Sequence, residues 1–248
     1  TIEPSGGNFP QTATAIRLAA SDAKDETANW HAEVLAFLHS LRDQGGLSDW
    51  NQVAFLYRSV KSDRAVALAQ FLETNAIPVY SPRSNMFFDR EEIRLMVGAL
   101  IFLFPQFPKV RQWAEGAHLV IWDYYDQHCF RPFTDELRKP ENKRLLDWAR
   151  PLAKRHVVLA QNTDYSFSGL LYQLLQFPLF SRFLVEDVIQ GADKGRAAHN
   201  LAMFSKLLTK FEYLHYVSVL NPAFLEKNLR DLFNQFLRFL YDGGINEY

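Results

Sequence analysis

Apolar positions in the first hundred residues alternate between two periodicities. The short apolar runs of strand length are residues 15–20, 53–57 and 77–80. The stretches with helical spacing are residues 25–44, 62–75 and 91–104. This order is typical of a parallel sheet with right-handed crossovers, so we predict an α/β fold with 53–57 buried on both faces. Three strands leave open edges, and we therefore expect the sheet to be incomplete in this chain.

The pattern changes after Pro105, and no strand alternation follows it. Two long helical stripes dominate the C-terminal part. One consists of Leu201, Phe204, Leu207, Leu208, Phe211 and Leu214, and the other of Leu225, Leu229, Leu232, Phe233, Phe236 and Leu240. We expect the Asn221-Pro222 step to start the last helix, with Pro222 at or near its first position, and Asp242-Gly243-Gly244 to end it. We therefore predict an α/β unit at residues 1–104 and an all-helical unit at 105–248.

Composition narrows the class of protein. Of the 248 residues, 48% are hydrophobic and 15% aromatic, which favours a folded chain. The net charge of -1 gives no global basic field, so any contact with a polyanion must be local. The single cysteine, Cys129, excludes an internal disulfide and fits a reducing cytoplasm. We see no membrane span and no signal peptide, and we expect a cytoplasmic protein without a membrane partner.

Motifs of common catalytic sites are absent. The sequence contains no G-x-x-x-x-G-K-[ST] phosphate loop, no G-x-S-x-G elbow and no H-E-x-x-H pair. The histidines lack the spacing of metal ligands, and we interpret His39, His118, His128, His156 and His215 as structural or solvent-facing. We therefore predict no catalytic residue and no metal ligand in this chain.

The segment of residues 57–64, the Arg58 segment, lies where the second predicted strand ends and a helix begins. Its polar residues include Arg58, Ser59, Lys61, Ser62 and Arg64. Parallel α/β sheets bind ligands at this edge, and a helix N-terminus with nearby cations suits a phosphate. A capped helix with Ser59 or Ser62 as N-cap, and with solvated cations, explains the residues equally well.

A second basic zone spans residues 138–155. Its cations are Arg138, Lys139, Lys143, Arg144, Arg150, Lys154 and Arg155, against Glu141 and Asp147. Such an excess can neutralise duplex phosphates, although a solvated helical face is the more common explanation. A third charged group, Asp89, Glu91 and Glu92, opens the predicted helix at 91–104, and we assign it to the positive end of the helix dipole.

Several pieces of the first unit occur in a characteristic order. They are Val53-Ala54-Phe55-Leu56-Tyr57-Arg58-Ser59 with Arg64, then Ile77-Pro78, then Phe87-Phe88-Asp89-Arg90-Glu91-Glu92-Ile93-Arg94. This order resembles the UvrD/Rep/PcrA type of superfamily 1 DNA helicases, which carry V-A-V-L-Y-R-x-N-x-Q-S-R, I-P-Y and G-G-x-x-F-F-x-R-x-E-I-K-D. Upstream, Asp25, Glu26 and Ala28 are similar to a D-E-A stretch of that family. The resemblance covers about residues 15–104.

The resemblance implies a partial RecA-like domain with a parallel three-layer sheet, followed by the helical insertion that closes on duplex DNA. It implies an ATP-dependent helicase or translocase moving 3′ to 5′, with ATP and magnesium bound in the full-length protein and none in this fragment. Its arginine that contacts single-stranded DNA maps onto Arg58, and we expect Ser59, Lys61 and Arg64 to assist it. The residues expected to form the motor–insertion junction are Phe87, Phe88, Arg90 and Glu92. Expected partners are DNA, as a single strand or a junction, and repair or recombination proteins.

Some positions depart from the family. Val60 stands where the family has an asparagine, Arg83-Ser84 where it has two glycines, and Leu95 where it has an aspartate. The G-I-G turn that the helical insertion uses on duplex DNA is absent. Two alternatives remain open: a subunit of a recombination helicase–nuclease, and a non-catalytic protein-interaction module derived from the fold.

Overall fold

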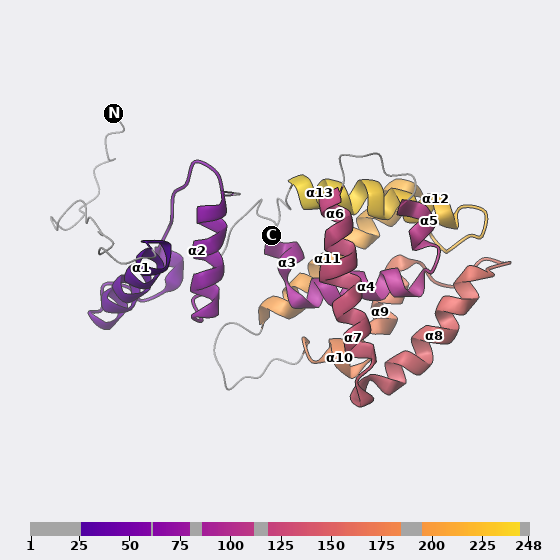
Figure 1. Cartoon of the computed structure of the whole chain (residues 1–248), viewed down its shortest axis with the longest axis horizontal. Coiled ribbons are helices and arrows are strands. Elements are labelled where there is room, and N and C mark those ends of the chain that lie inside the picture. Colours follow the sequence, from indigo (N-terminus) through magenta and orange to yellow (C-terminus); the bar gives the residue numbers. More distant parts are fainter. Residues whose placement is uncertain (1–25, 61, 80–85, 112–118, 185–194, 244–248) are drawn as a thin grey trace. The chain divides into compact units, whose positions relative to one another are not determined.

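The computed structural model describes residues 26–60, 62–79, 86–111, 119–184 and 195–243. All regular secondary structure in these ranges is helical (Figure 1). The chain divides into two compact units, residues 1–57 with 67–79 and residues 58–66 with 80–248.

The first unit contains α1 (Glu26–Asp43), the 3₁₀-helix η1 (Trp50–Gln52) and most of α2 (Asp63–Thr74). Its small core consists of Val34, Leu38, Leu68, Leu72 and Ile77. Helix α1 ends as the sequence predicts, because Gly45 adopts φ +73° and the Gly46 amide donates to the Leu41 carbonyl at 2.8 Å. This hydrogen bond belongs to a Schellman C-cap, which glycine favours.

The predicted parallel sheet, and with it the α/β class and the partial three-layer RecA-like fold, is wrong: the described residues contain no strand. Residues 53–57 have no regular secondary structure. Val53 and Tyr57 pack against the small core, whereas Phe55 is 42% and Leu56 is 95% exposed. A strand covered on both faces would bury these side chains as well. The first expected strand, residues 15–20, lies outside the described residues.

The third expected strand, residues 77–80, has a different explanation. Ala76 adopts φ 60°, and the Ile77 amide donates to the Leu72 carbonyl at 2.9 Å. Ile77 then packs on the same core as Leu72. An apolar residue after a left-handed position, bonded back into the last turn, is the Schellman cap of α2. The burial of Ile77 therefore reflects helix termination; Tyr80 lies outside the described residues.

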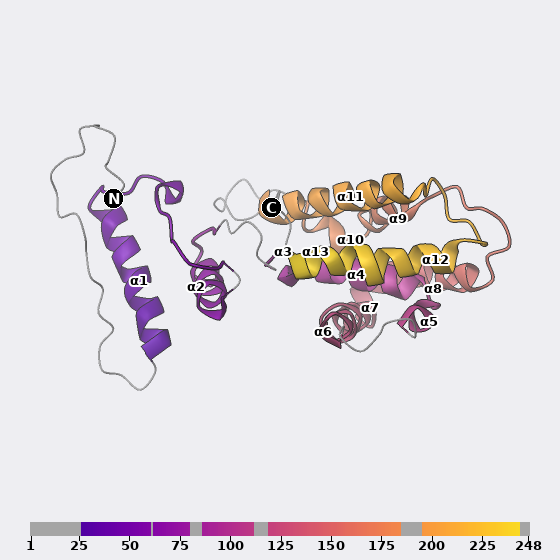
Figure 2. The same ribbon diagram turned by 90° about the horizontal axis from the view of Figure 1, so that it is seen from above.

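The second unit is helical in its described parts (Figure 2). Its elements are α3 (Met86–Asp89), α4 (Glu91–Leu103), α5 (Phe107–Arg111), α6 (Leu119–Asp123), the π-helix η3 (Tyr124–Phe130), α7 (Arg131–Leu137), the 3₁₀-helix η4 (Pro140–Asn142), α8 (Lys143–Val157), α9 (Phe167–Leu174), α10 (Pro178–Ser181), α11 (Gly195–His215), α12 (Leu225–Arg230), the π-helix η5 (Asp231–Leu237) and α13 (Arg238–Gly243).

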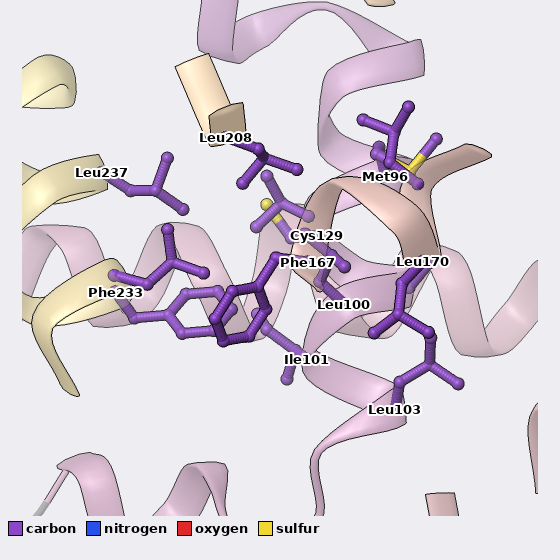
Figure 3. Close-up of a cluster of buried hydrophobic side chains, with 14 of the residues drawn as sticks. Met96, Leu100, Ile101, Leu103, Cys129, Phe167, Leu170, Leu208, Phe233 and Leu237 are labelled. Atoms are coloured by element: carbon purple, nitrogen blue, oxygen red, sulfur yellow. The ribbon is translucent and has the colours of Figure 1, made fainter. Parts of the chain in front are cut away.

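Helix α4 forms the centre of this unit. It contacts η3, α7, α8, α9 and α11. Figure 3 shows Met96, Leu100 and Ile101 of α4 among buried side chains from η3, α9, α11 and η5. The prediction of a buried helix over 91–104 is confirmed. The domain boundary expected at 104–108 lies inside the second unit.

The C-terminal helices follow the predicted stripes with two exceptions. In α11, Leu201, Phe204, Leu207, Leu208 and Phe211 are buried, but Leu214 is 54% exposed near the helix end. The last helical stretch begins with α12 at Leu225 and not at Pro222. The side chain of Asn221 accepts a hydrogen bond from the Ala223 amide at 2.8 Å, and this Asx turn holds Pro222 outside the helix.

Candidate nucleic-acid interface

The Arg58 segment begins at Tyr57, the last residue of the irregular stretch 53–57. Arg58 and Ser59 are exposed, and Arg64 is exposed in the first turn of α2. Lys61 lies outside the described residues. The segment thus presents guanidinium groups at the surface, which is the chemistry needed to hold phosphate oxygens.

The start of α2 distinguishes between the two interpretations of this segment, a phosphate site at the helix N-terminus and a capped helix with solvated cations. The Ser62 hydroxyl accepts a hydrogen bond from the Ala65 amide at 3.4 Å, as an N-cap does. Asp63 adds a carboxylate in the first turn. This carboxylate interacts favourably with the positive end of the helix dipole, but it repels a bound anion. A phosphate would therefore be held through Arg58 and its neighbours rather than by the amides of α2.

All seven cations of the basic zone, residues 138–155, are exposed. Three of them form ion pairs with residues three or four positions away: Arg138 with Asp135 at 2.7 Å, Lys139 with Glu136 at 2.6 Å, and Lys143 with Asp147 at 2.5 Å. The hydrogen bond from Lys139 to Glu136 raises the pKa of that lysine. Over residues 135–155 seven cations face four carboxylates, so the local excess of charge is smaller than residues 138–155 alone indicate.

Helix α8 carries most of this zone. Its inward face buries Leu145, Ala149, Leu152, Ala153 and His156. The exposed cations on the remainder of the helix are Lys143, Arg144, Arg150, Lys154 and Arg155. The helix is therefore amphipathic, with an apolar face on α4 and a basic face toward solvent. Both a solvated face and a surface for a polyanion fit this arrangement.

His156 serves a structural role beneath this face. Its Nδ1 lies 2.7 Å from the Leu103 carbonyl oxygen and its Nε2 lies 3.0 Å from the Tyr165 hydroxyl. The ring stacks on Phe104 at 4.6 Å, and the Gln106 amide donates to the His156 carbonyl. A neutral ring that donates from Nδ1 and accepts at Nε2 satisfies both partners. Burial accordingly lowers the pKa of His156.

The expected junction residues lie in α3 and at the start of α4. Phe87 and Phe88 are fully or almost fully buried, and the Tyr124 hydroxyl donates to the Phe88 carbonyl at 2.8 Å. The buried carboxylate of Glu92 accepts a hydrogen bond from Asn200 of α11 at 2.6 Å. Arg90 is half-buried and is the N-cap residue of α4. These contacts tie the first turn of α4 to elements far along the chain.

Nearby acidic residues also have structural partners. Glu91 forms an ion pair with Arg182, with 2.6 Å between Oε1 and Nη2. Burial raises the pKa of the Asp89 carboxyl, and Arg94, His128 and Arg90 oppose that shift. Asp89 ends α3 and keeps exposed surface, while Glu91 and Glu92 occupy the first turn of α4 as the dipole argument predicts.

A cavity beside α8 is a feature that the sequence did not predict. Its volume is about 380 Å³. The residues that line it are Ile101, Phe102, Phe104, Pro105, Phe107, Pro108, Asp126, Phe130, Arg150, Ala153, Lys154 and Val157. The sequence signal was the aromatic run between residues 102 and 107, interrupted by proline, but its juxtaposition with α8 is a tertiary feature.

Among the described residues, no group of three or more His, Cys, Asp or Glu side chains could hold a metal ion. No described helix combines the length and apolar composition that a membrane crossing requires. Comparison with protein-family models, with curated proteins and with solved structures gave no match to this chain.

Proposed function

We propose that this chain is a component of an ATP-dependent DNA helicase or translocase of the UvrD/Rep/PcrA type, moving 3′ to 5′. In this proposal the Arg58 segment contacts the backbone of single-stranded DNA and the helical unit faces the duplex. ATP and magnesium are bound by the full-length helicase outside these 248 residues, because the chain has no phosphate loop. The same proposal places the protein in the cytoplasm, with DNA and repair or recombination proteins as partners.

The observation that carries the proposal is the order of the motifs together with the exposure of Arg58. The arginine that follows the V-A-F-L-Y run is at the surface, where a phosphate can reach it. A charge-assisted hydrogen bond from its guanidinium to a phosphate oxygen is short and strong. Exposed Ser59 and Arg64 supply further donors on the same segment.

A second support comes from the F-F-D-R-E-E motif. Phe87 and Phe88 of α3 and Glu92 in the first turn of α4 are buried, and Tyr124 and Asn200 donate hydrogen bonds to Phe88 and Glu92. A motif that anchors the start of a helical body fits the role of a junction between a motor and its helical insertion. The proposal uses no sheet, since none is present in the described residues.

The first experiment is an anisotropy titration of a fluorescent single-stranded oligonucleotide with the whole chain. We expect Arg58→Ala to weaken binding by about 1–3 kcal/mol, the range for a hydrogen bond to a charged group. Lys210→Ala, an exposed lysine of α11, is the matched control and should leave affinity unchanged. A salt series should give a shallower slope for Arg58→Ala than for the unaltered chain.

Equal affinity of Arg58→Ala and the unaltered chain across the salt series would remove the Arg58 segment from the site. A second titration with a single-strand/duplex junction tests the helical unit. Replacing Arg144 and Arg155, two exposed cations of α8, should weaken junction binding more than single-strand binding if that unit faces the duplex.

A protein-interaction module is the second candidate function. One observation favours it: the apolar cavity beside the basic face of α8 has walls that suit a protein side chain better than a phosphate.

A further inference from the structure

We infer that the cavity between α4, α5, η3 and α8, with the basic face of α8, is a docking site for an acidic protein segment that inserts apolar anchor side chains. The inference uses no residue of the Arg58 segment, but it assigns the basic face of α8 to a protein segment, whereas the helicase proposal assigns that face to duplex DNA.

The walls of the cavity select the chemistry of the anchor. Phe102, Phe104, Phe107 and Phe130 contribute aromatic surface, and Ile101 and Val157 contribute aliphatic surface. With about 380 Å³, the cavity lies near the lower end of pockets that bind ligands, roughly 300–1,000 Å³. One or two large apolar side chains fit this volume. Their insertion would remove the apolar walls of the cavity and the side chains themselves from water.

Two apolar lining residues, and the residue that follows one of them in the chain, are exposed to solvent. Phe130 is 36% exposed, Val157 is 54% exposed and Val158, the next residue, is 74% exposed. An occupant confined to the cavity would leave Val158 in water. A longer segment that covers the rim as well as the cavity removes more apolar area from solvent, which favours a peptide over a compact small molecule.

The charged residues around the cavity indicate the net charge of the occupant. Arg150 and Lys154 line the cavity and are exposed, and they lie on the same face of α8 because they are four residues apart. Lys143 lies about 16 Å from Lys154, at 1.5 Å per residue, but it forms an ion pair with Asp147. The excess of positive charge on α8 therefore comes from Arg144, Arg150, Lys154 and Arg155. One carboxylate, Asp126, lines the opposite wall. Cations spread along a helix complement several acidic groups rather than one.

Other anionic ligands fit less well. A duplex would use the cations of α8 but would leave the apolar cavity empty, since phosphates do not insert into it. A nucleobase has hydrogen-bonding edges that phenylalanine walls leave unsatisfied. A fatty acid would fill the cavity, but its single carboxylate pairs with only one or two cations. An acidic helix with apolar residues at i and i+4 uses both the cavity and the charged row.

The probe is a fluorescein-labelled peptide of about 14 residues with phenylalanine and leucine at i and i+4 and glutamate or aspartate elsewhere. It is titrated with the whole chain and read by fluorescence anisotropy. Two matched peptides serve as controls, one with alanine at both anchors and one with lysine in place of the acidic residues. We expect the anchored acidic peptide to bind and both controls to bind at least about tenfold more weakly.

Variants of the protein locate the site. Val157→Glu places a carboxylate on the rim and Lys154→Glu reverses a lining cation; each should weaken peptide binding about tenfold or more. Their matched controls are Val120→Glu, where the valine is 69% exposed on α6, and Lys210→Glu on α11. The controls should bind as the unaltered chain does. All four side chains are exposed, and circular dichroism confirms that each variant is folded.

Three outcomes would overturn the inference: no binding of the anchored acidic peptide at about 100 µM, equal binding of the alanine-anchored peptide, and equal weakening by Val157→Glu and Val120→Glu. A competition with dodecanoate and with a short duplex separates the other ligand classes. Dodecanoate that binds where the peptide does not would assign the cavity to an anionic amphiphile instead.

Discussion

Gly98 of α4 lies against the backbone of Cys129 in the π-helix η3. A Cβ placed on Gly98 would lie 2.2 Å from the Cys129 carbonyl oxygen and 2.8 Å from Cβ of Phe133. Non-bonded carbon and oxygen atoms do not approach so closely, so only glycine permits this contact between α4 and the η3–α7 stretch. The close approach lies in the centre of the second unit, where Met96, Leu100 and Cys129 meet (Figure 3).

We expect Gly98→Ala to destabilise the second unit by about 1–3 kcal/mol or more, the range for overpacking. The better helix propensity of alanine, up to about 1 kcal/mol, offsets only part of this loss. The measurement is the free energy of unfolding from urea titrations followed by circular dichroism. Gly243→Ala is the matched control, because an added Cβ there meets no atom within 4 Å. Similar stability of Gly98→Ala and the unaltered chain would contradict the packing described for α4.

A second prediction concerns Glu212, a buried carboxylate of α11. It accepts hydrogen bonds from the Ser168 backbone amide at 2.6 Å and from the Ser168 hydroxyl at 2.7 Å. Ser168 lies in the first turn of α9, so Glu212 caps that helix from another element. Glu212→Ala should cost about 1–3 kcal/mol, because two part-buried donors of Ser168 lose their charged acceptor. Thermal unfolding should show a lowered Tm, with exposed Glu141→Ala unchanged as the control.

A third prediction concerns pH and His156. Burial lowers the pKa of His156 most, Arg155 lowers it further, and the hydrogen bond to the Leu103 carbonyl opposes both. The unfolded chain, with an ordinary pKa near about 6.5, therefore binds a proton at a higher pH than the folded chain. Above that pH the ring is neutral in both states and contributes no pH dependence. As the pH falls below about 6.5, the folded state should lose stability until its own ring titrates.

The check is the free energy of unfolding between pH 5 and pH 7.5 for the unaltered chain and for His156→Leu. The variant should be less stable at pH 7.5, because it loses the hydrogen bonds to Leu103 and Tyr165, but its stability should fall less steeply toward pH 5. Parallel curves for the two proteins would show that another group causes the pH dependence. His39, an exposed residue of the first unit, is a suitable site for a control substitution.

A fourth prediction follows from the helicase proposal. Purified alone, the chain should hydrolyse no ATP, with or without single-stranded DNA, because it contains no phosphate loop. A coupled assay for ADP release measures this directly. Turnover that stays with the chain through successive purification steps would contradict the assignment of ATP binding to other parts of the helicase.

The sequence by itself determined the helices whose boundaries are local. Gly45-Gly46 ends α1 because glycine accepts a left-handed backbone, and the apolar run over 91–104 forms a helix because it is long and continuous. The sequence also located the Arg58 segment and the basic zone, since charge is read directly from residue type. The periodicity of apolar residues predicts helices and does not indicate which ligand those cations contact.

Only the tertiary structure decided the rest. Residues 53–57 and Ile77 have the composition of strands, but a strand exists only when a neighbour supplies backbone hydrogen bonds, and Ile77 instead closes the cap of α2. The cavity beside α8, the cap of α9 by Glu212 and the contact of Gly98 with Cys129 each join residues distant in the chain. Pairings of that kind depend on how helices pack in three dimensions, and a pattern along one helix specifies a face without specifying its partner.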